Sequence, residues 1–176
     1  MRICEQALIA LVLGLLGIAT AAADGPDLGR AATPAEIAAI DISIPPDGEG
    51  LPPGAGDAIA GEPVYVAKCA ACHGEGGRGK PADALVGGIG SLASDKPVKS
   101  VGSYWPYATT LFDYVRRAMP LDAPLSLPDD EVYAVSAYLL WLNGILPRDF
   151  RLDAGSLPAV AMPNRGGFVD RSSVRD

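Results

Sequence analysis

The sequence has few of the residues that usually bind metal ions or cross-link a small domain. Its 176 residues include one histidine, His73, and three cysteines. A zinc site would need two further cysteine or histidine ligands beside Cys69 and Cys72. Cys4 lies in a segment that we expect to be removed, so the sequence excludes a zinc site. No cysteine then remains for a structural disulfide outside the pair Cys69 and Cys72.

Long hydrophobic runs are missing after the N-terminus. Residues 1–23 combine an early arginine, an apolar run from Ala7 to Ile18 and three alanines before Asp24, which is the pattern of a secretory signal peptide. We expect cleavage after Ala23 and no membrane span in the mature chain. An uncleaved N-terminal anchor is the alternative, although the run is short for a membrane span.

Basic residues are outnumbered by acidic ones. The chain has 14 Lys and Arg against 21 Asp and Glu, which gives a formal net charge of −7. Nucleic acids and anionic membranes attract positively charged proteins, so the composition argues against both as partners. Residues 61–120 are locally basic and can meet an acidic patch on a partner, although a solvated mixed surface fits equally well.

The sequence does contain Cys69-Ala70-Ala71-Cys72-His73, the C-x-x-C-H signature of c-type haem attachment. Each thiol can bond one vinyl side arm of a porphyrin, and the histidine is then placed under the iron as a ligand. A redox dithiol is the alternative, but it would lie near a βαβ pattern, whereas the flanks here read as helical. We predict one covalent haem c. Bacteria attach such haem outside the cytoplasmic membrane, so a periplasmic location agrees with the export signal.

Helical patterns surround this motif. Thr33-Pro34-Ala35-Glu36 forms a capping box that predicts a short helix to about Ile40. Apolar spacing predicts three longer helices, over residues 57–73, 109–118 and 126–143. We expect Ser126 to cap the last of them.

No alternating strand pattern is present, and the chain is therefore predicted to have an all-α fold around a cofactor. We expect a signal peptide at 1–23, a Pro- and Gly-rich arm at 24–56, a haem domain at 57–147 and a C-terminal extension at 148–176. The ring of His73 needs a hydrogen-bond acceptor on its second nitrogen, and we expect a backbone carbonyl between Arg78 and Leu85.

The second axial ligand can be sought by elimination. No other histidine or free cysteine is left in the mature chain, so Met119 and Met162 are the thioether candidates. We predict Met119, which lies on a Met-Pro turn between two predicted helices, while Met162, Lys80 and an open site remain alternatives. A His/Met pair raises the haem potential and leaves no vacant position for a substrate, which favours electron transfer over catalysis.

A dense aromatic cluster, Ser103-Tyr104-Trp105-Pro106-Tyr107, lies before the second long helix. We identify Trp105 and Tyr107 as candidate haem-binding residues, because they can wall the porphyrin, and an indole N–H, a tyrosine hydroxyl or Ser103 can donate to its propionates. Ordinary core packing is the alternative interpretation.

The motif, the Met-Pro turn and the closing helix resemble a class I cytochrome c. More narrowly, residues 101–120, then 129–134 and Met162-Pro163-Asn164-Arg165, are similar to the cytochrome subunits of bacterial sulfite and sulfane dehydrogenases. The similarity covers about residues 40–168. It implies a class I cytochrome c fold with extended arms, thioether bonds at Cys69 and Cys72, and axial ligation by His73 and Met119.

In that family a molybdenum subunit oxidises a sulfur compound and passes electrons singly to the haem subunit. The resemblance therefore implies a molybdenum-cofactor dehydrogenase subunit as partner, a downstream cytochrome or oxidase as acceptor, and no catalytic residue on this chain. The single C-x-x-C-H favours the single-haem sulfite type, since sulfane dehydrogenase cytochromes usually bear a second haem domain. A diffusible carrier for another periplasmic dehydrogenase and an open-site haem enzyme or sensor remain alternatives.

Overall fold

The structure is a computed structural model that describes residues 29–169. The predicted signal peptide, including Cys4, and the last residues of the C-terminal extension lie outside the described residues. The chain divides into two compact units, with the boundary between Asp41 and Ile42. Within the described range, no helix is long and apolar enough to span a bilayer.

The described part of the first unit contains helix α2 (Pro34–Ile40), as the capping box predicts. The Glu36 N–H donates to the Thr33 hydroxyl, and the Glu36 carboxylate accepts the Thr33 N–H at 2.8 Å. Hydrogen bonding to Arg30, followed by that to Thr33, lowers the pKa of Glu36 to about 2. Helix α2 buries none of its residues, so these local contacts, and not packing, stabilise it.

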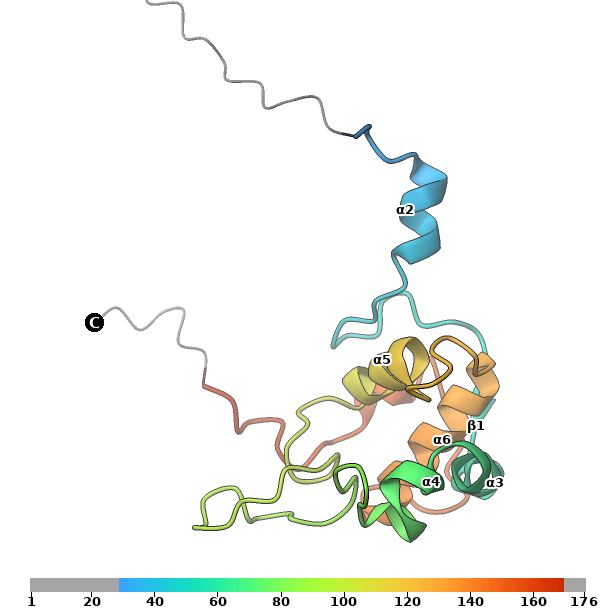
Figure 1. The fold of residues 1–176 in the computed structure, drawn as a ribbon. Coiled ribbons are helices and arrows are strands. Elements are labelled where there is room, and N and C mark those ends of the chain that lie inside the picture. Colours follow the sequence, from blue (N-terminus) through green and yellow to red (C-terminus); the bar gives the residue numbers. More distant parts are fainter. Residues whose placement is uncertain (1–28, 170–176) are drawn as a thin grey trace, which may run out of the picture. The chain divides into compact units, whose positions relative to one another are not determined.

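The second unit contains the haem motif and most of the helices (Figure 1). In chain order these are α3 (Ala58–Lys68), α4 (Ala70–His73), the 3₁₀ turn η1 (Glu75–Gly77), α5 (Ala108–Ala118), α6 (Asp129–Leu142) and the 3₁₀ turn η2 (Leu157–Ala159). The predicted helix over 57–73 is thus present but is interrupted at Cys69.

The predicted cap of the last helix is wrong. Helix α6 begins at Asp129 with Pro128 as its N-cap, and no side chain caps it. A residue that precedes a proline is disfavoured in the helical region, so Leu127 stays outside the helix and Ser126 lies too early to cap it. Acidic residues occupy the first turn instead, where the helix dipole favours them.

Helix α6 forms the centre of the core and is buried continuously from Val132 to Leu140. Helix α3 crosses it at Gly61, where an added Cβ would lie 2.0 Å from the Ala134 carbonyl oxygen. Helix α5 packs on another side, with the rings of Phe112 and Tyr133 at 4.5 Å between centroids. The C-x-x-C-H motif follows α3 directly, so this crossing determines where the motif lies.

Two short strands that the sequence does not predict join the flanks of the haem domain. Strand β1 (Ala55–Gly56) pairs antiparallel with β2 (Leu152–Asp153), and strands this short show no alternation that a sequence pattern could detect. The fold is therefore mostly helical with a small sheet, and not purely α-helical.

These strands belong to two segments that cover the helices. We call residues 42–56 the N-terminal strap and residues 148–162 the C-terminal strap. The N-terminal strap is held by hydrogen bonds, since the Tyr133 hydroxyl donates to the Pro52 carbonyl at 2.9 Å and the Ile44 N–H donates to Asp113 at 2.9 Å. The C-terminal strap buries apolar side chains in the core: Leu152, Leu157, Val160 and Met162.

Candidate functional site

The C-x-x-C-H motif forms a single turn at the end of α3. The chain leaves the helix at Cys69, whose N–H still donates to the Tyr65 carbonyl at 2.9 Å, and resumes a helical turn from Ala70 to His73. Cys69 is half-buried and Cys72 is exposed, and neither forms a disulfide. The two thiols are therefore free to make other bonds.

The ring of His73 is oriented by one backbone acceptor. Its Nδ1 lies 2.9 Å from the Asp83 carbonyl oxygen, inside the range 78–85 that the sequence predicts. A carbonyl oxygen can only accept, so Nδ1 carries a hydrogen, and in the neutral ring Nε2 is then the nitrogen with the lone pair. The protein thus holds this histidine in the tautomer that a metal ligand requires.

The loop that contains Asp83 is bonded to the motif at further points. The Gly79 N–H donates to the His73 carbonyl at 2.8 Å, and the Ala82 N–H donates to the Cys72 carbonyl at 2.9 Å. Gly74 has a φ of +73°, and an added Cβ would lie 2.5 Å from the Gly79 carbonyl oxygen. Only glycine fits this close approach.

Tyr65 is a supporting residue that the sequence analysis missed. Its side chain is buried, and its hydroxyl donates to the Gly74 carbonyl at 2.8 Å, which fixes the turn directly after His73. The available signal was an aromatic residue one helical turn before Cys69, on the face that carries the apolar spacing of α3.

The thiols are poorly suited to redox chemistry as a dithiol. Burial raises the pKa of Cys69 to about 11, whereas a reactive thiol needs a lowered pKa to form the thiolate. Within residues 29–169, no group of three or more His, Cys, Asp or Glu side chains could hold a metal ion. Both observations favour covalent attachment of a cofactor over the dithiol and zinc interpretations.

Met119 follows directly after α5. It is half-buried against the core, and its N–H donates to the Val115 carbonyl at 3.1 Å. Arg116 in the same turn pairs through Nε with Asp129 at 3.1 Å, which ties the end of α5 to the start of α6. Arg117 pairs with the buried carboxylate of Asp113. The backbone around Met119 is therefore fixed on both sides.

The alternative ligands are placed differently. Met162 is only 4% exposed and belongs to the apolar core beneath the C-terminal strap. Lys80 is exposed on the loop that is hydrogen-bonded to His73, whereas a second axial ligand must approach the iron from the other face. Neither residue shows the half-buried position that Met119 has.

Trp105 and Tyr107 are both half-buried. The Trp105 ring meets the Tyr114 ring edge to face, with centroids 5.6 Å apart, and the Arg165 guanidinium lies 5.1 Å from the centroid of Tyr107. Ser103 differs from both, because it is buried and its hydroxyl donates to the Val98 carbonyl at 2.6 Å. The hydroxyl hydrogen of Ser103 is therefore used inside its own loop.

Asn143 anchors the loop between the motif and α5, a role that the sequence analysis missed. Its amide donates to the Leu139 carbonyl at 2.8 Å and to the Leu85 carbonyl at 3.1 Å, and its oxygen accepts the Gly87 N–H at 3.2 Å. In the sequence, Asn143 precedes Gly144 and resembles a simple helix stop, so nothing there signals this contact.

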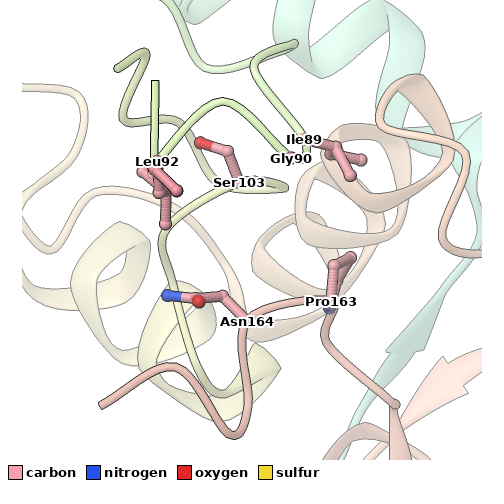
Figure 2. A pocket seen from close by; sticks show the side chains of 7 residues that line it. Ile89, Gly90, Leu92, Ser103, Pro163 and Asn164 are labelled. Carbon is pink, nitrogen blue, oxygen red and sulfur yellow. The ribbon is translucent and has the colours of Figure 1, made fainter. Parts of the chain in front are cut away.

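A surface pocket of about 350 Å³ lies between this loop and the residues after the C-terminal strap (Figure 2). Its lining consists of Ile89, Gly90, Leu92, Ala93, Ser103, Pro163 and Asn164. The Asn164 amide donates to the Tyr104 carbonyl at 2.7 Å, so, like the hydroxyl of Ser103, it is engaged within the protein. Of the residues considered for haem binding, Ser103 lines this pocket, and its hydroxyl is already used within its own loop. The lining does not include Cys69, Cys72, His73, Trp105, Tyr107 or Met119.

The residues at the edge of the core fit a large apolar cofactor. A group of apolar side chains packs on the core but stays partly open, including Val64, Cys69, Ala70, Leu85, Trp105 and Met119. Exposing them to water is unfavourable, and a porphyrin that covers them would remove this cost. Together with two free thiols and a histidine whose Nδ1 is engaged by a backbone carbonyl, this donor set matches haem c.

The comparisons with known proteins point the same way. Residues 56–139 match the family model described as "Cytochrome C oxidase, cbb3-type, subunit III". No curated protein matches the chain significantly. A chain in the crystal structure of the sulfane dehydrogenase SoxCD from Paracoccus pantotrophus is 43% identical, with a TM-score of 0.76, over 85% of this chain and 75% of that one. The chain therefore belongs to the cytochrome c family of electron-transfer proteins and is a relative of this sulfane dehydrogenase chain.

Proposed function

We propose that the chain is a periplasmic cytochrome with one covalent haem c, which carries electrons from a molybdenum sulfite- or sulfane-type dehydrogenase subunit to the respiratory chain. The observation that carries this proposal is the 43% identity, over 85% of the chain, to a chain of a sulfane dehydrogenase. The aligned 85% of the chain is longer than the haem domain at 57–147. The alignment therefore also includes parts of the straps.

In this proposal Cys69 and Cys72 would hold the porphyrin by thioether bonds, and His73 Nε2 and Met119 Sδ would bind the iron. The haem supplies a one-electron Fe³⁺/Fe²⁺ couple. The Asp83 carbonyl, 2.9 Å from His73 Nδ1, orients the imidazole and increases its basicity. The thioether of Met119 raises the reduction potential. Because His73 and Met119 would both serve as iron ligands, this chain would offer no open position to a substrate, and the oxidation would take place on the partner subunit.

Trp105 and Tyr107 have a supporting role in the proposal. Each is half-buried beside the core, and each combines an apolar ring with one polar group. The exposed parts of the two rings pack against the porphyrin. The indole N–H and the phenol hydroxyl donate hydrogen bonds to its propionates. The single C-x-x-C-H motif supports one haem, and the apolar N-terminal run supports export.

The test is purification of the native complex, followed by measurement of its haem and molybdenum content. We expect the two to co-purify, and we expect sulfite or a persulfide to reduce the haem, seen as the sharpened visible band of ferrous haem c. A native protein that elutes alone, and whose haem is not reduced by either compound in the presence of a molybdenum sulfite-type dehydrogenase, would overturn the proposal. Carbon monoxide binding to the reduced protein would instead indicate an open-site enzyme or sensor.

A further inference from the structure

The loop that follows Met119 exposes two large apolar side chains. We call residues 119–128 the Met loop. All of its side chains from Leu121 to Ser126 are exposed, and Leu121 and Leu125 are 79% and 62% exposed. Single exposed leucines are common on protein surfaces. Here two of them lie within one short loop, directly after the candidate iron ligand.

Leu125 is also held in an unfavourable backbone conformation. Its φ is +62°, in the left-handed region where glycine and asparagine are tolerated and a bulky side chain is a rare outlier. The side chain is not buried, so packing inside this chain does not explain a leucine at this position. Residues in strained conformations cluster at functional sites and binding surfaces.

The Met loop is presented by a fixed framework. The ion pair between Arg116 and Asp129, at 3.1 Å, joins the helices on either side of it. The Ala123 N–H donates to the Pro120 carbonyl at 3.0 Å and forms a turn inside it. Leu127 is buried at its far end. The two leucines are therefore exposed on a loop whose backbone is held in place at both ends.

The charge on the Met loop beside these leucines has one sign. Asp122 lies between them, and the sequence contains no lysine or arginine from residue 118 to residue 147. The neighbouring acids Asp129 and Glu131 pair with Arg116 and Lys68, and Asp130 accepts the Ala55 N–H at 2.8 Å. Within the Met loop Asp122 is the acidic residue, and it forms no ion pair with any residue of the described range. The Met loop thus combines two exposed leucines with one exposed carboxylate between them in the sequence.

We propose that the Met loop is the docking surface for the electron-donating dehydrogenase subunit, which covers Leu121 and Leu125 with an apolar patch and places a lysine or arginine against Asp122. This inference rests on the proposed function. Docking at this loop brings the donor next to a candidate axial ligand, which shortens the route to the iron. In the step itself the donor centre loses one electron and the ferric haem gains it, and no bond forms or breaks.

The test uses the holoprotein, the purified dehydrogenase subunit and sulfite or a persulfide, and measures the rate of haem reduction against cytochrome concentration. Leu125→Asn removes the apolar side chain but tolerates a positive φ, and Leu121→Ser removes the second contact. We expect each variant to raise the concentration for half-maximal rate about tenfold, as for a central interface residue. The midpoint potential and the visible spectrum should stay unchanged, and the Tm of Leu125→Asn should be equal or higher.

Ile59→Ser is the matched control, since Ile59 is also exposed, at 55%, but lies on α3. Asp122→Asn should weaken the dependence of the reduction rate on ionic strength. Equal kinetics for the wild-type protein and both leucine variants would overturn the docking proposal and leave the proposed function intact. If the dehydrogenase does not reduce the wild-type protein, the proposed function is overturned. The proposal that the dehydrogenase docks on the Met loop then fails as well.

Discussion

His73 and Met119 are held in different ways. The His73 ring is fixed through its own side chain, because Nδ1 donates to the Asp83 carbonyl at 2.9 Å. Met119 is fixed through its backbone and through the ion pairs of its neighbours Arg116 and Arg117. The side chain at position 119 can therefore be exchanged without breaking a hydrogen bond, whereas the ring at position 73 cannot.

This difference makes Met119→His an informative variant. We expect it to lower the midpoint potential of the haem by a clear fraction of the roughly 0.8 V over which axial ligands set haem potentials, because imidazole stabilises ferric iron better than a thioether does. A redox titration followed by visible absorbance measures the shift. Met162→Leu is the control and should leave the potential unchanged, since Met162 is buried in the core. An unchanged potential and spectrum in Met119→His would remove Met119 from the role.

Helices α3 and α6 approach each other closely where they cross at Gly61. An alanine Cβ at position 61 would lie 2.0 Å from the Ala134 carbonyl oxygen and 2.9 Å from the Tyr138 side chain. The backbone at this position is helical, so glycine is needed here for space, and not for its conformational freedom. The two helices can approach this closely only because residue 61 has no side chain.

Gly61→Ala should therefore destabilise the fold. Forcing helices apart in a packed core typically costs about 1–3 kcal/mol, and we expect a loss of about 3 kcal/mol because the clash is with backbone. Denaturant unfolding of the holoprotein, monitored by far-UV circular dichroism, measures it. Gly166→Ala, where an added Cβ meets no atom within 4 Å, should leave the unfolding free energy unchanged. Equal stability of the two variants would show that the crossing is looser than described.

Helix α2 depends on charge and not on packing. Arg30 and Thr33 lower the pKa of Glu36 from 4.5 to about 2. A carboxyl group whose pKa is lower in the folded state stabilises that state fully above its unfolded pKa, and this contribution is lost as the pH falls through the folded value. The helix should therefore weaken between about pH 4.5 and about pH 2.

Cα chemical shifts of residues 34–40, measured by NMR from about pH 6 down to about pH 2, follow this loss. Glu36→Gln keeps a side chain that can accept the Thr33 N–H but cannot titrate, so its helix signal should not change with pH in this interval. A titrating helix signal in Glu36→Gln would assign the effect to another group.

How far sequence predicts these elements depends on whether the signal is local. The capping box of α2 and the carbonyl acceptor of His73 lie within a few residues of the groups they bind, and both predictions are confirmed. The cap at Ser126 failed because Pro128 overrides it. Tyr65 and Asn143 act through contacts with the backbone of loops, and their residue types alone do not specify such partners.

For the whole haem domain, the straps have a larger role than their composition suggests. The sequence predicts a Pro- and Gly-rich arm at 24–56 and an extension at 148–176 outside the haem domain. In the structure the N-terminal strap hydrogen-bonds to α5 and α6, and the C-terminal strap contributes buried side chains to the core. Gly48 of one strap packs on Pro158 of the other. These segments therefore serve the fold itself.

Removing the C-terminal strap should abolish folding. A chain that ends at Pro147 loses four buried apolar residues, and each contributes roughly 1.5–3 kcal/mol by burial. The sum is comparable with the total stability of a domain. A chain that ends at Gly167 keeps all four and should fold. Proteolysis and circular dichroism of the two truncated holoproteins distinguish them, and a stable protein ending at Pro147 would show that the strap is dispensable.

The pairing of Ala55 with Asp153 also has a consequence for the order in which the parts of the chain fold. The N-terminal strap leaves the ribosome before the haem motif, but its strand partner comes only after α6 has been made. Closing so long a loop costs chain entropy before the contact forms, so we expect the small sheet to close late in folding. The C-x-x-C-H turn needs only nearby residues to form. If the chain carries the proposed haem, this order would allow attachment while the core is still open, and the straps would then close around the cofactor.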